Sequence, residues 1–214
     1  MICRLCGSKK TVHLEDIALE KNNYFHCNIC DLIFLPAEEK PAPSRERKRY
    51  LRHDNTFACR GYVERFESFI EDFISPYLSE IEKTLDFGCG PGPVLASLLK
   101  EKGLNVNIYD PYFFPDEGYR SEYYDLITCT EVLEHLKQPL RELNHMISLL
   151  NPEGYLAAMT SLHPGPEKFS EWNYRLDDTH ITFFSQKTIH WLIDNISLVQ
   201  IKSNEKNQFL FRKK

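Results

Sequence analysis

The sequence lacks any long hydrophobic run and any apolar segment at its start. None of its apolar stretches approaches the roughly 18–20 residues needed to span a bilayer. The opening residues, Met1-Ile2-Cys3-Arg4, do not form the apolar region of a secretory signal. No internal repeat or low-complexity tract is visible either. We therefore expect a cytoplasmic protein without a membrane partner.

What is present is the composition of an ordinary globular protein, with 42% hydrophobic and 27% charged residues. The 214 residues suffice for one sizeable α/β domain and a small accessory unit. Residues 1–60 contain 11 Lys and Arg against 8 Asp and Glu, whereas residues 61–214 contain 15 against 23. The acidic larger part argues against a polyanionic substrate such as RNA. The basic cluster at 45–49 is interpreted as a solvated helix or linker face.

Four of the seven cysteines are paired in sequence. Two C-x2-C pairs with 20 residues between them are typical of a structural zinc site: Cys3, Cys6, Cys27 and Cys30. Disulfides are disfavoured in a cytosolic chain, and so short a segment would need the metal in order to fold. Gly7 and Asp31 follow the two cysteine pairs, at the positions where the turn of a zinc knuckle requires a left-handed backbone conformation. His13 and His26 are interpreted as ordinary surface or turn residues. The sequence thus predicts a zinc-ribbon-like unit at 1–36.

Residues 37–60 are predicted to be a linker that becomes helical near Ser44, because prolines at its start give way to charged residues. Residues 61–80 have apolar positions at helical spacing. Cys59, Cys89 and Cys129 are isolated in sequence and are interpreted as small hydrophobic residues, the last two of them buried, and not as nucleophiles.

The segment Thr84-Leu85-Asp86-Phe87-Gly88-Cys89-Gly90-Pro91-Gly92-Pro93 predicts a buried strand, a glycine turn and the start of a helix. A helix N-terminus after such a turn suits an anionic ligand group. A second strand at 105–109 ends on Asp110, where nucleotide folds bind a ribose diol. The dinucleotide fingerprint G-x-G-x-x-G/A fails, because Pro93 occupies its last position. The pattern present is D-x-G-x-G-x-G.

Together with Tyr124-Asp125-Leu126-Ile127-Thr128-Cys129-Thr130-Glu131-Val132-Leu133-Glu134-His135, this pattern resembles the class I S-adenosylmethionine-dependent methyltransferases over about residues 60–214. The resemblance implies an α/β fold with a Rossmann-like sheet of seven strands in a domain at 61–214. Only 12 residues separate Asp110 from Tyr123, and they include two prolines. We therefore expect a loop or an abbreviated strand where the family has its third strand.

The remaining pattern predicts strands at 83–87, 124–130 and 155–160, and a closing hairpin at 197–203 and 207–212. Helices are predicted at 92–102, 138–150 and 186–195, the last capped by Ser185, with a turn at 151–154. The long connection at 161–178 is a candidate lid over a site.

The resemblance also implies a set of residues that bind S-adenosylmethionine. The glycine turn would accommodate the amino-acid end of the donor, with Asp86 fixing the turn or approaching the ammonium. Asp110 would accept hydrogen bonds from both ribose hydroxyls. The residues just past the fourth strand would face donor and acceptor. The expected set is Asp86, Gly88, Cys89, Gly90, Gly92, Asp110, Thr130, Glu131 and Val132.

Methyl transfer mainly requires alignment of the reactants and exclusion of water, with a base where the acceptor must lose a proton. His135 and His180 are the candidate bases, with Glu134 as an orienting partner. The alternative for each histidine is a structural hydrogen bond.

The predicted function is methyl transfer to an oxygen or carbon nucleophile of a small molecule, such as a sugar or related metabolite. An RNA base methyltransferase is one alternative, disfavoured because Thr130-Glu131-Val132-Leu133 stands where an Asn/Asp-Pro-Pro-Tyr motif would clamp an exocyclic amine. A non-catalytic zinc-ribbon interaction protein and an NAD-dependent oxidoreductase are the others. Specificity is expected in residues 161–184 and in the N-terminal unit. The acceptor and the oligomeric state stay open.

Overall fold

A computed structural model describes residues 1–14, 23–52 and 55–214. The strands are β1 (Thr11–Leu14), β2 (Tyr24–Cys27), β3 (Ile33–Phe34), β4 (Lys83–Phe87), β5 (Asn105–Tyr109), β6 (Tyr124–Thr130), β7 (Leu150–Met159), β8 (Thr182–Phe183), β9 (Leu198–Ser203) and β10 (Gln208–Lys213). The α-helices are α1 (Pro43–Tyr50), α2 (Arg60–Phe69), α3 (Val94–Glu101), α4 (Pro139–Leu149) and α5 (Gln186–Asn195). Short 3-10 turns occur at Ala37–Glu39, Glu117–Ser121, Leu133–His135, Pro166–Glu171 and Asn173–Leu176.

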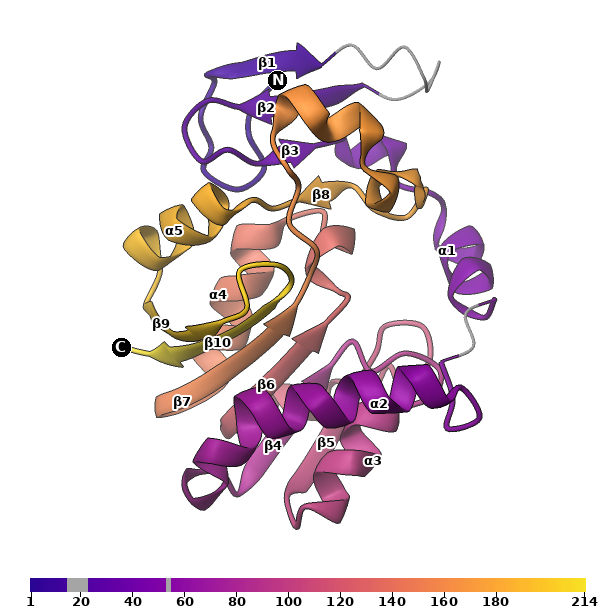
Figure 1. Ribbon diagram of the computed structural model, residues 1–214, viewed down its shortest axis with the longest axis vertical. Helices are drawn as coiled ribbons and strands as arrows, with labels where there is room; N and C mark the ends of the chain where they lie inside the picture. Colours follow the sequence, from indigo (N-terminus) through magenta and orange to yellow (C-terminus); the bar gives the residue numbers. More distant parts are fainter. Residues whose placement is uncertain (15–22, 53–54) are drawn as a thin grey trace.

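The larger sheet has six strands in the order β5-β4-β6-β7-β10-β9 (Figure 1). Strands β5, β4, β6 and β7 are parallel, and β10 is antiparallel to both of its neighbours. The Rossmann-like α/β fold and the closing hairpin are as predicted. The prediction of seven strands is wrong for the described residues, because this sheet ends at β5.

The shortness of the chain after β5 explains the missing strand. A parallel neighbour requires a crossover of a dozen or more residues before the new strand begins. Here Asp110 instead forms an isolated antiparallel bridge with Phe114, and the 3-10 turn at Glu117–Ser121 follows. Tyr119 packs against Tyr109 with ring centroids 4.4 Å apart, which covers part of the open edge.

The two faces of the sheet are covered by different helices, because successive strand residues point to opposite sides. On β6, Leu126 packs in a core with α2 and α3, whereas Ile127 packs in a core with α4 and α5. The second core extends to the N-terminal unit, since buried Leu5 and Phe34 belong to it. Helix α5 begins with a capping box between Ser185 and Thr188, as the sequence predicts for the cap.

The helix predicted over 61–80 is interrupted. After α2 the chain forms a π turn at Ile70–Ile74 and a 3-10 helix at Ser75–Glu80. Pro76 lacks the N–H that would bond the carbonyl of Asp72. Lys202 Nζ donates to that carbonyl at 2.7 Å instead. The predicted turn at 151–154 also differs, because it lies inside β7 as an irregularity, with Glu153 at φ 61°.

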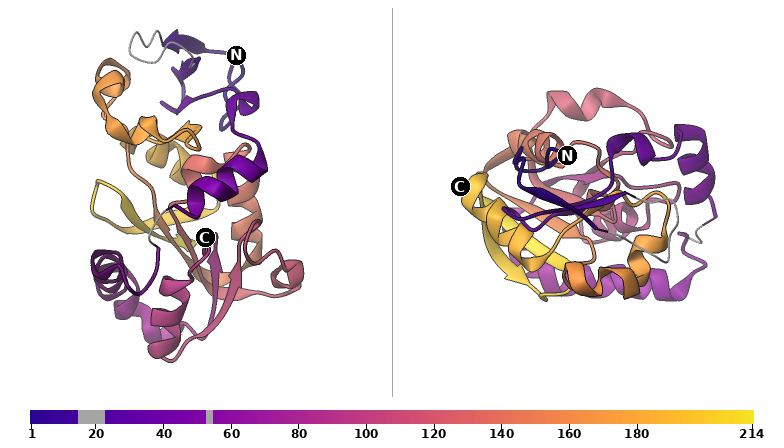
Figure 2. Two further views of the ribbon diagram at one scale, coloured as in Figure 1. Left: turned by 90° about the vertical axis from the view of Figure 1, so that its right-hand side faces the viewer. Right: turned by 90° about the horizontal axis from the view of Figure 1, so that it is seen from above.

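The N-terminal strands form a second sheet, in the order β1-β2-β3-β8. Strand β8 comes from the far side of the long connection, and Ile33 pairs with Phe183. This sheet lies at one end of the molecule, with residues 161–181 beside it (Figures 1 and 2). Tyr24, Phe169 and Phe183 share a core there. The part of the connection predicted to be a lid is therefore anchored on the N-terminal unit.

None of the described helices is long and apolar enough to cross a bilayer.

Candidate active site

The glycine turn between β4 and α3 is held against the end of β5. The N–H groups of Gly88 and Cys89 both donate to the carbonyl of Tyr109, at 2.7 and 3.1 Å. Gly88 has φ 82°, and a Cβ added there would lie 2.2 Å from Val132 Cγ2. Only glycine combines this backbone with this close approach. The turn is thereby fixed next to the residues that follow β6.

Asp110 supports the same turn from the end of β5. Its Oδ2 accepts a hydrogen bond from the N–H of Gly90 at 3.1 Å. Its Oδ1 accepts from the N–H groups of Tyr112 and Phe113, at 2.8 and 3.1 Å. A carboxylate offers about four acceptor positions, so the oxygens retain capacity for a ligand hydroxyl.

Asp86 lies on β4 directly before the turn and is 2% exposed. Thr128 Oγ1 on the neighbouring strand donates to Asp86 Oδ1 at 2.8 Å. Burial raises the pKa of Asp86 to about 6, although the bond from Thr128 opposes the shift. The site therefore contains a buried carboxylate that is ionised at neutral pH and has no Lys or Arg ion pair among the described residues.

Residues after β6 place one further carboxylate, Glu131, on the cavity wall and a second, Glu134, behind it. Glu131 has φ 55°, a conformation that costs energy outside glycine, and its N–H donates to Met159 O at 2.8 Å. Its carboxylate forms an ion pair with Arg65 of α2. Tyr174 OH donates to Glu131 Oε2 at 3.2 Å and also contacts Glu134 Oε1. These contacts join α2, the end of β6 and the long connection.

Glu134 is fully buried. Thr160 Oγ1, just past β7, donates to Glu134 Oε2 at 2.9 Å. Burial and the nearby charge of Glu131 raise the pKa of Glu134 to about 8.

The two predicted bases meet at the cavity. His135 Nδ1 donates to Thr179 O at 3.0 Å, and His180 Nδ1 donates to Tyr174 O at 2.7 Å. Their ring centroids are 4.8 Å apart. Burial lowers the pKa of His135 to about 3 and also lowers the pKa of His180. Both rings are neutral at pH 7, each with a lone pair on Nε2.

A cavity of about 560 Å³ joins these groups at the carboxyl ends of β4, β5 and β6. This edge of an open parallel sheet is where α/β folds bind ligands. The structure brings all but one of the predicted donor and catalytic residues to its wall: Asp86, Gly88, Cys89, Gly90, Asp110, Thr130, Glu131, Val132, His135 and His180. Gly92 lies outside the wall, where an added Cβ would meet Asn55 O at 2.4 Å.

Several cavity residues were not singled out from the sequence. Arg65 belongs to the regular pattern of α2, and Tyr174 is one of several aromatics in the long connection. Glu46 does not line the cavity itself but supports two residues that do; it lies in the basic cluster interpreted as a solvated face, yet it is 2% exposed. It accepts hydrogen bonds from Tyr50 and Tyr112, at 2.9 and 2.7 Å. The sequence signal for a buried role of Glu46 was that it is a single acidic residue in an otherwise basic helix.

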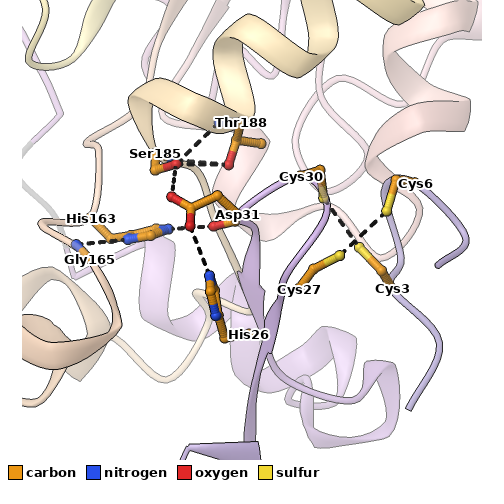
Figure 3. Close-up of polar contacts among 10 residues, drawn as sticks. All are labelled: Cys3, Cys6, His26, Cys27, Cys30, Asp31, His163, Gly165, Ser185 and Thr188. Carbon is orange, nitrogen blue, oxygen red and sulfur yellow. Dashed lines mark hydrogen bonds and ion pairs between the residues drawn. The ribbon is translucent and has the colours of Figure 1, made fainter. Parts of the chain in front are cut away.

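The four paired cysteines also meet, at the end of β2 and in the turns beside it (Figure 3). Their Sγ atoms lie within 4.8 Å of one another, with Cys3–Cys30 and Cys6–Cys27 both at 3.5 Å. None of the four forms a disulfide. Four cysteine sulfurs this close match the donor set of a tetrahedral structural zinc site. Gly7 and Asp31 have φ 70° and 62°, which are the left-handed conformations expected after the two pairs.

Asp31 connects this cluster to the methyltransferase-like part of the chain. Its carboxylate accepts hydrogen bonds from His26 Nε2 at 2.9 Å and from Ser185 Oγ at 2.6 Å. Its carbonyl accepts from His163 Nε2, also at 2.9 Å (Figure 3). The residue after the second cysteine pair thus contacts both ends of the segment 163–185.

Residues 50–199 match the sequence profile of a family described as "Methyltransferase domain". This match covers well over half of the chain, and the chain therefore belongs to that family of methyltransferase domains. The enzyme class expected from the sequence, an S-adenosylmethionine-dependent methyltransferase, is confirmed.

Two solved structures have the same fold. The N-methyltransferase NodS from Bradyrhizobium japonicum WM9, in complex with S-adenosyl-L-homocysteine, is 17% identical, with a TM-score of 0.51 over 79% of this chain and 97% of NodS. An S-adenosylmethionine-dependent methyltransferase from Archaeoglobus fulgidus is 18% identical, with a TM-score of 0.53 over 72% of this chain and 96% of that chain.

Two curated relatives match a shorter stretch. Ubiquinone biosynthesis O-methyltransferase from Yersinia enterocolitica is 27% identical over 99 residues, which is 35% of this chain and 40% of the relative. The enzyme of the same name from Salmonella paratyphi A is 30% identical over 97 residues, which is 34% of this chain and 40% of the relative. The match thus spans well under half of each relative.

Proposed function

We propose that this protein transfers the methyl group of S-adenosylmethionine to an oxygen or carbon nucleophile of a small molecule. The observation that carries the proposal is the single cavity that joins the glycine turn, Asp86 and Asp110 to the neutral imidazoles of His135 and His180. The O-methyltransferase relatives favour oxygen as the acceptor atom. A sugar or related metabolite is the acceptor class that we propose.

The donor half of the cavity consists of the groups around the glycine turn. Gly90 leaves space for a ligand beside the backbone, because an added Cβ there would meet nothing within 4 Å, and ionised Asp86 complements an ammonium group. The free acceptor capacity of Asp110 suits a ribose diol. When bound, S-adenosylmethionine supplies a methyl carbon that is already activated by its sulfonium.

The acceptor half consists of the groups after β6 and in the long connection. His135 and His180 present unprotonated Nε2 atoms, and either one accepts a proton from the acceptor in the simplest mechanism. Tyr174 closes this side of the cavity, and its hydroxyl is fixed by Glu131 and Glu134. Residues 166–176 therefore help to exclude water during transfer.

We also propose that Cys3, Cys6, Cys27 and Cys30 hold a structural zinc ion. The proposed organisation is a zinc unit at 1–36, a linker at 37–60 and a methyltransferase domain at 61–214. Because β8 completes the N-terminal sheet, the zinc unit would support the acceptor half of the cavity through residues 181–185. The net acidity of residues 61–214 supports a small molecule over a nucleic acid as the substrate.

The test is calorimetric titration of zinc-replete protein with S-adenosyl-L-homocysteine. We expect saturable binding in the wild type, strong weakening in Asp110→Ala and unchanged binding in Asp194→Ala, a matched change at an exposed position on α5. Absence of binding in the wild type, or equal binding by all three proteins, would contradict the proposal.

A further inference from the structure

Two histidines on the wall of the cavity and one glutamate buried behind them bring metal-binding atoms together. Glu134, His135 and His180 each offer one ligand atom, and these atoms lie within 4.8 Å of one another. Glu134 and His135 belong to the turn after β6, whereas His180 belongs to the segment that leads into β8. Two sequence-distant segments therefore contribute to one compact cluster, which is separate from the four cysteines.

The hydrogen bonds of the two histidines fix which nitrogen is free. A carbonyl oxygen only accepts, so Nδ1 of His135 must carry the proton that is donated to Thr179 O, and Nδ1 of His180 the one donated to Tyr174 O. The lone pair of each ring is then on Nε2. No hydrogen bond within the described part of the chain uses either Nε2. Imidazoles oriented by a backbone carbonyl at the opposite nitrogen are the arrangement seen at metal sites.

Glu134 adds a carboxyl oxygen to this pair of neutral imidazoles. It is 0% exposed, and over the described ranges no Lys or Arg forms an ion pair with it. Its hydrogen bonds from Thr160 and Tyr174 occupy two of about four acceptor positions. Ionising a carboxyl group at so buried a position is costly, and a cation beside it would offset that cost.

We propose that Glu134, His135 and His180 bind a divalent transition-metal ion whose open coordination positions face the cavity. Two imidazoles and a carboxylate suit zinc, iron(II), cobalt(II) or manganese(II). This inference rests on the proposed function and deepens it, because it assigns the acceptor a ligand role. The preferred acceptor is then a hydroxyl compound with a second oxygen placed to chelate the ion, such as a catechol or a vicinal diol.

The ion replaces direct proton abstraction by the histidines. Coordination lowers the pKa of the acceptor hydroxyl, so that its proton passes to the Glu131 carboxylate on the cavity wall and from there to solvent. The oxygen then forms a bond to the donor's methyl carbon as the bond between that carbon and sulfur breaks. S-adenosyl-L-homocysteine and the methyl ether leave, and the ion is neither oxidised nor reduced.

Manganese(II) is the probe that separates this site from the cysteines, because thiolate sites prefer softer ions. Full-length protein loaded with only one equivalent of zinc, which the four thiolates bind in preference, is titrated with manganese(II), and the free ion is followed by electron paramagnetic resonance. We expect one manganese(II) ion per chain in addition to zinc. His135→Ala and His180→Ala should each weaken this binding by more than about tenfold, the loss typical even of groups that only orient a ligand. His190→Ala, a matched change at an exposed position on α5, should leave it unchanged.

Retained zinc content and retained binding of S-adenosyl-L-homocysteine show that each variant is folded. A wild type that binds no manganese(II), or binding that survives both substitutions, overturns the inference. The two proposals fail separately: a wild type that binds S-adenosyl-L-homocysteine but no manganese(II) refutes the metal site alone. A wild type that binds manganese(II) at these histidines but no S-adenosyl-L-homocysteine supports the metal site and contradicts the methyl-transfer proposal.

Discussion

Asp86 is a buried acid that lowers the stability of the folded chain at neutral pH. Its pKa is raised from 3.8 to about 6 by burial, so the unfolded chain ionises at lower pH than the folded chain. Between these values the unfolded state binds fewer protons, and the free energy of unfolding therefore falls as pH rises. A pKa shift of this size lowers the free energy of unfolding by about 3 kcal/mol above pH 6.

We expect Asp86→Asn to be more stable than the wild type at pH 7.5, by up to about 3 kcal/mol, with the difference shrinking toward pH 4. Binding of S-adenosyl-L-homocysteine should weaken in the same variant. Urea unfolding across this pH range measures the first effect, and calorimetry the second. Asp194→Asn serves as the exposed control. A stability difference that does not change with pH would refute the raised pKa of Asp86.

Gly88 is constrained in two separable ways, by its positive φ and by its distance from Val132. Gly103 shares the positive φ, at 92°, but an added Cβ would meet nothing there within 4 Å. Backbone strain alone costs about 1–3 kcal/mol. We expect Gly103→Ala to lose that amount and Gly88→Ala clearly more, as measured by urea unfolding. Val132→Ala should recover part of the loss in the Gly88→Ala background. Equal losses for the two alanine variants would show that the contact with Val132 is unimportant.

At the scale of elements, the start of α5 connects the N-terminal sheet to the larger sheet. Ser185 accepts the capping bond from the N–H of Thr188 at 3.1 Å, and its hydroxyl donates to Asp31. We expect Ser185→Ala to lower the free energy of unfolding by about 1–2 kcal/mol, because it removes both bonds. Ser148→Ala, on the exposed side of α4, should change it by less than about 0.5 kcal/mol. A Ser185 variant as stable as the Ser148 variant would show that the two hydrogen bonds of Ser185 do not stabilise the fold.

The elements that the sequence predicts well are those encoded locally. The strand, glycine turn and helix around Gly88 follow from neighbouring residues, as does the strand that ends on Asp110. The helix break near Pro76 was missed, although the proline was a local signal. The pairing of β3 with β8 was missed because no local pattern identifies a distant partner strand.

The candidate site divides in the same way. Groups on strand ends, such as Asp86 and Glu131, were predictable from motif spacing. Arg65 and Tyr174 reach the cavity only through tertiary packing, and their neighbours in sequence give no hint of it. The clustering of the four paired cysteines was predictable from their spacing, whereas their connection to α5 through Asp31 was not.

At the scale of the whole molecule, metal removal should act on one end of the protein. Because β8 and the start of α5 contact the cysteine unit, removing zinc should increase hydrogen exchange at 163–185 and leave β4 to β5 protected. Hydrogen-exchange mass spectrometry of protein treated with a chelator measures this. Cys30→Ser should reproduce the pattern, and Cys59→Ser, outside the cluster, should not. Uniform loss of protection across both sheets would contradict the prediction.

The pairing of Ile33 with Phe183 also has a consequence for the order of events during synthesis. Strands β1 to β3 leave the ribosome early, but the strand that completes their sheet is made after all four parallel strands of the larger sheet. At ordinary elongation rates this interval is roughly ten to thirty seconds. The cysteine unit therefore has to persist with an open β3 edge for that time, and early capture of its metal would protect the nascent chain from pairing with other strands.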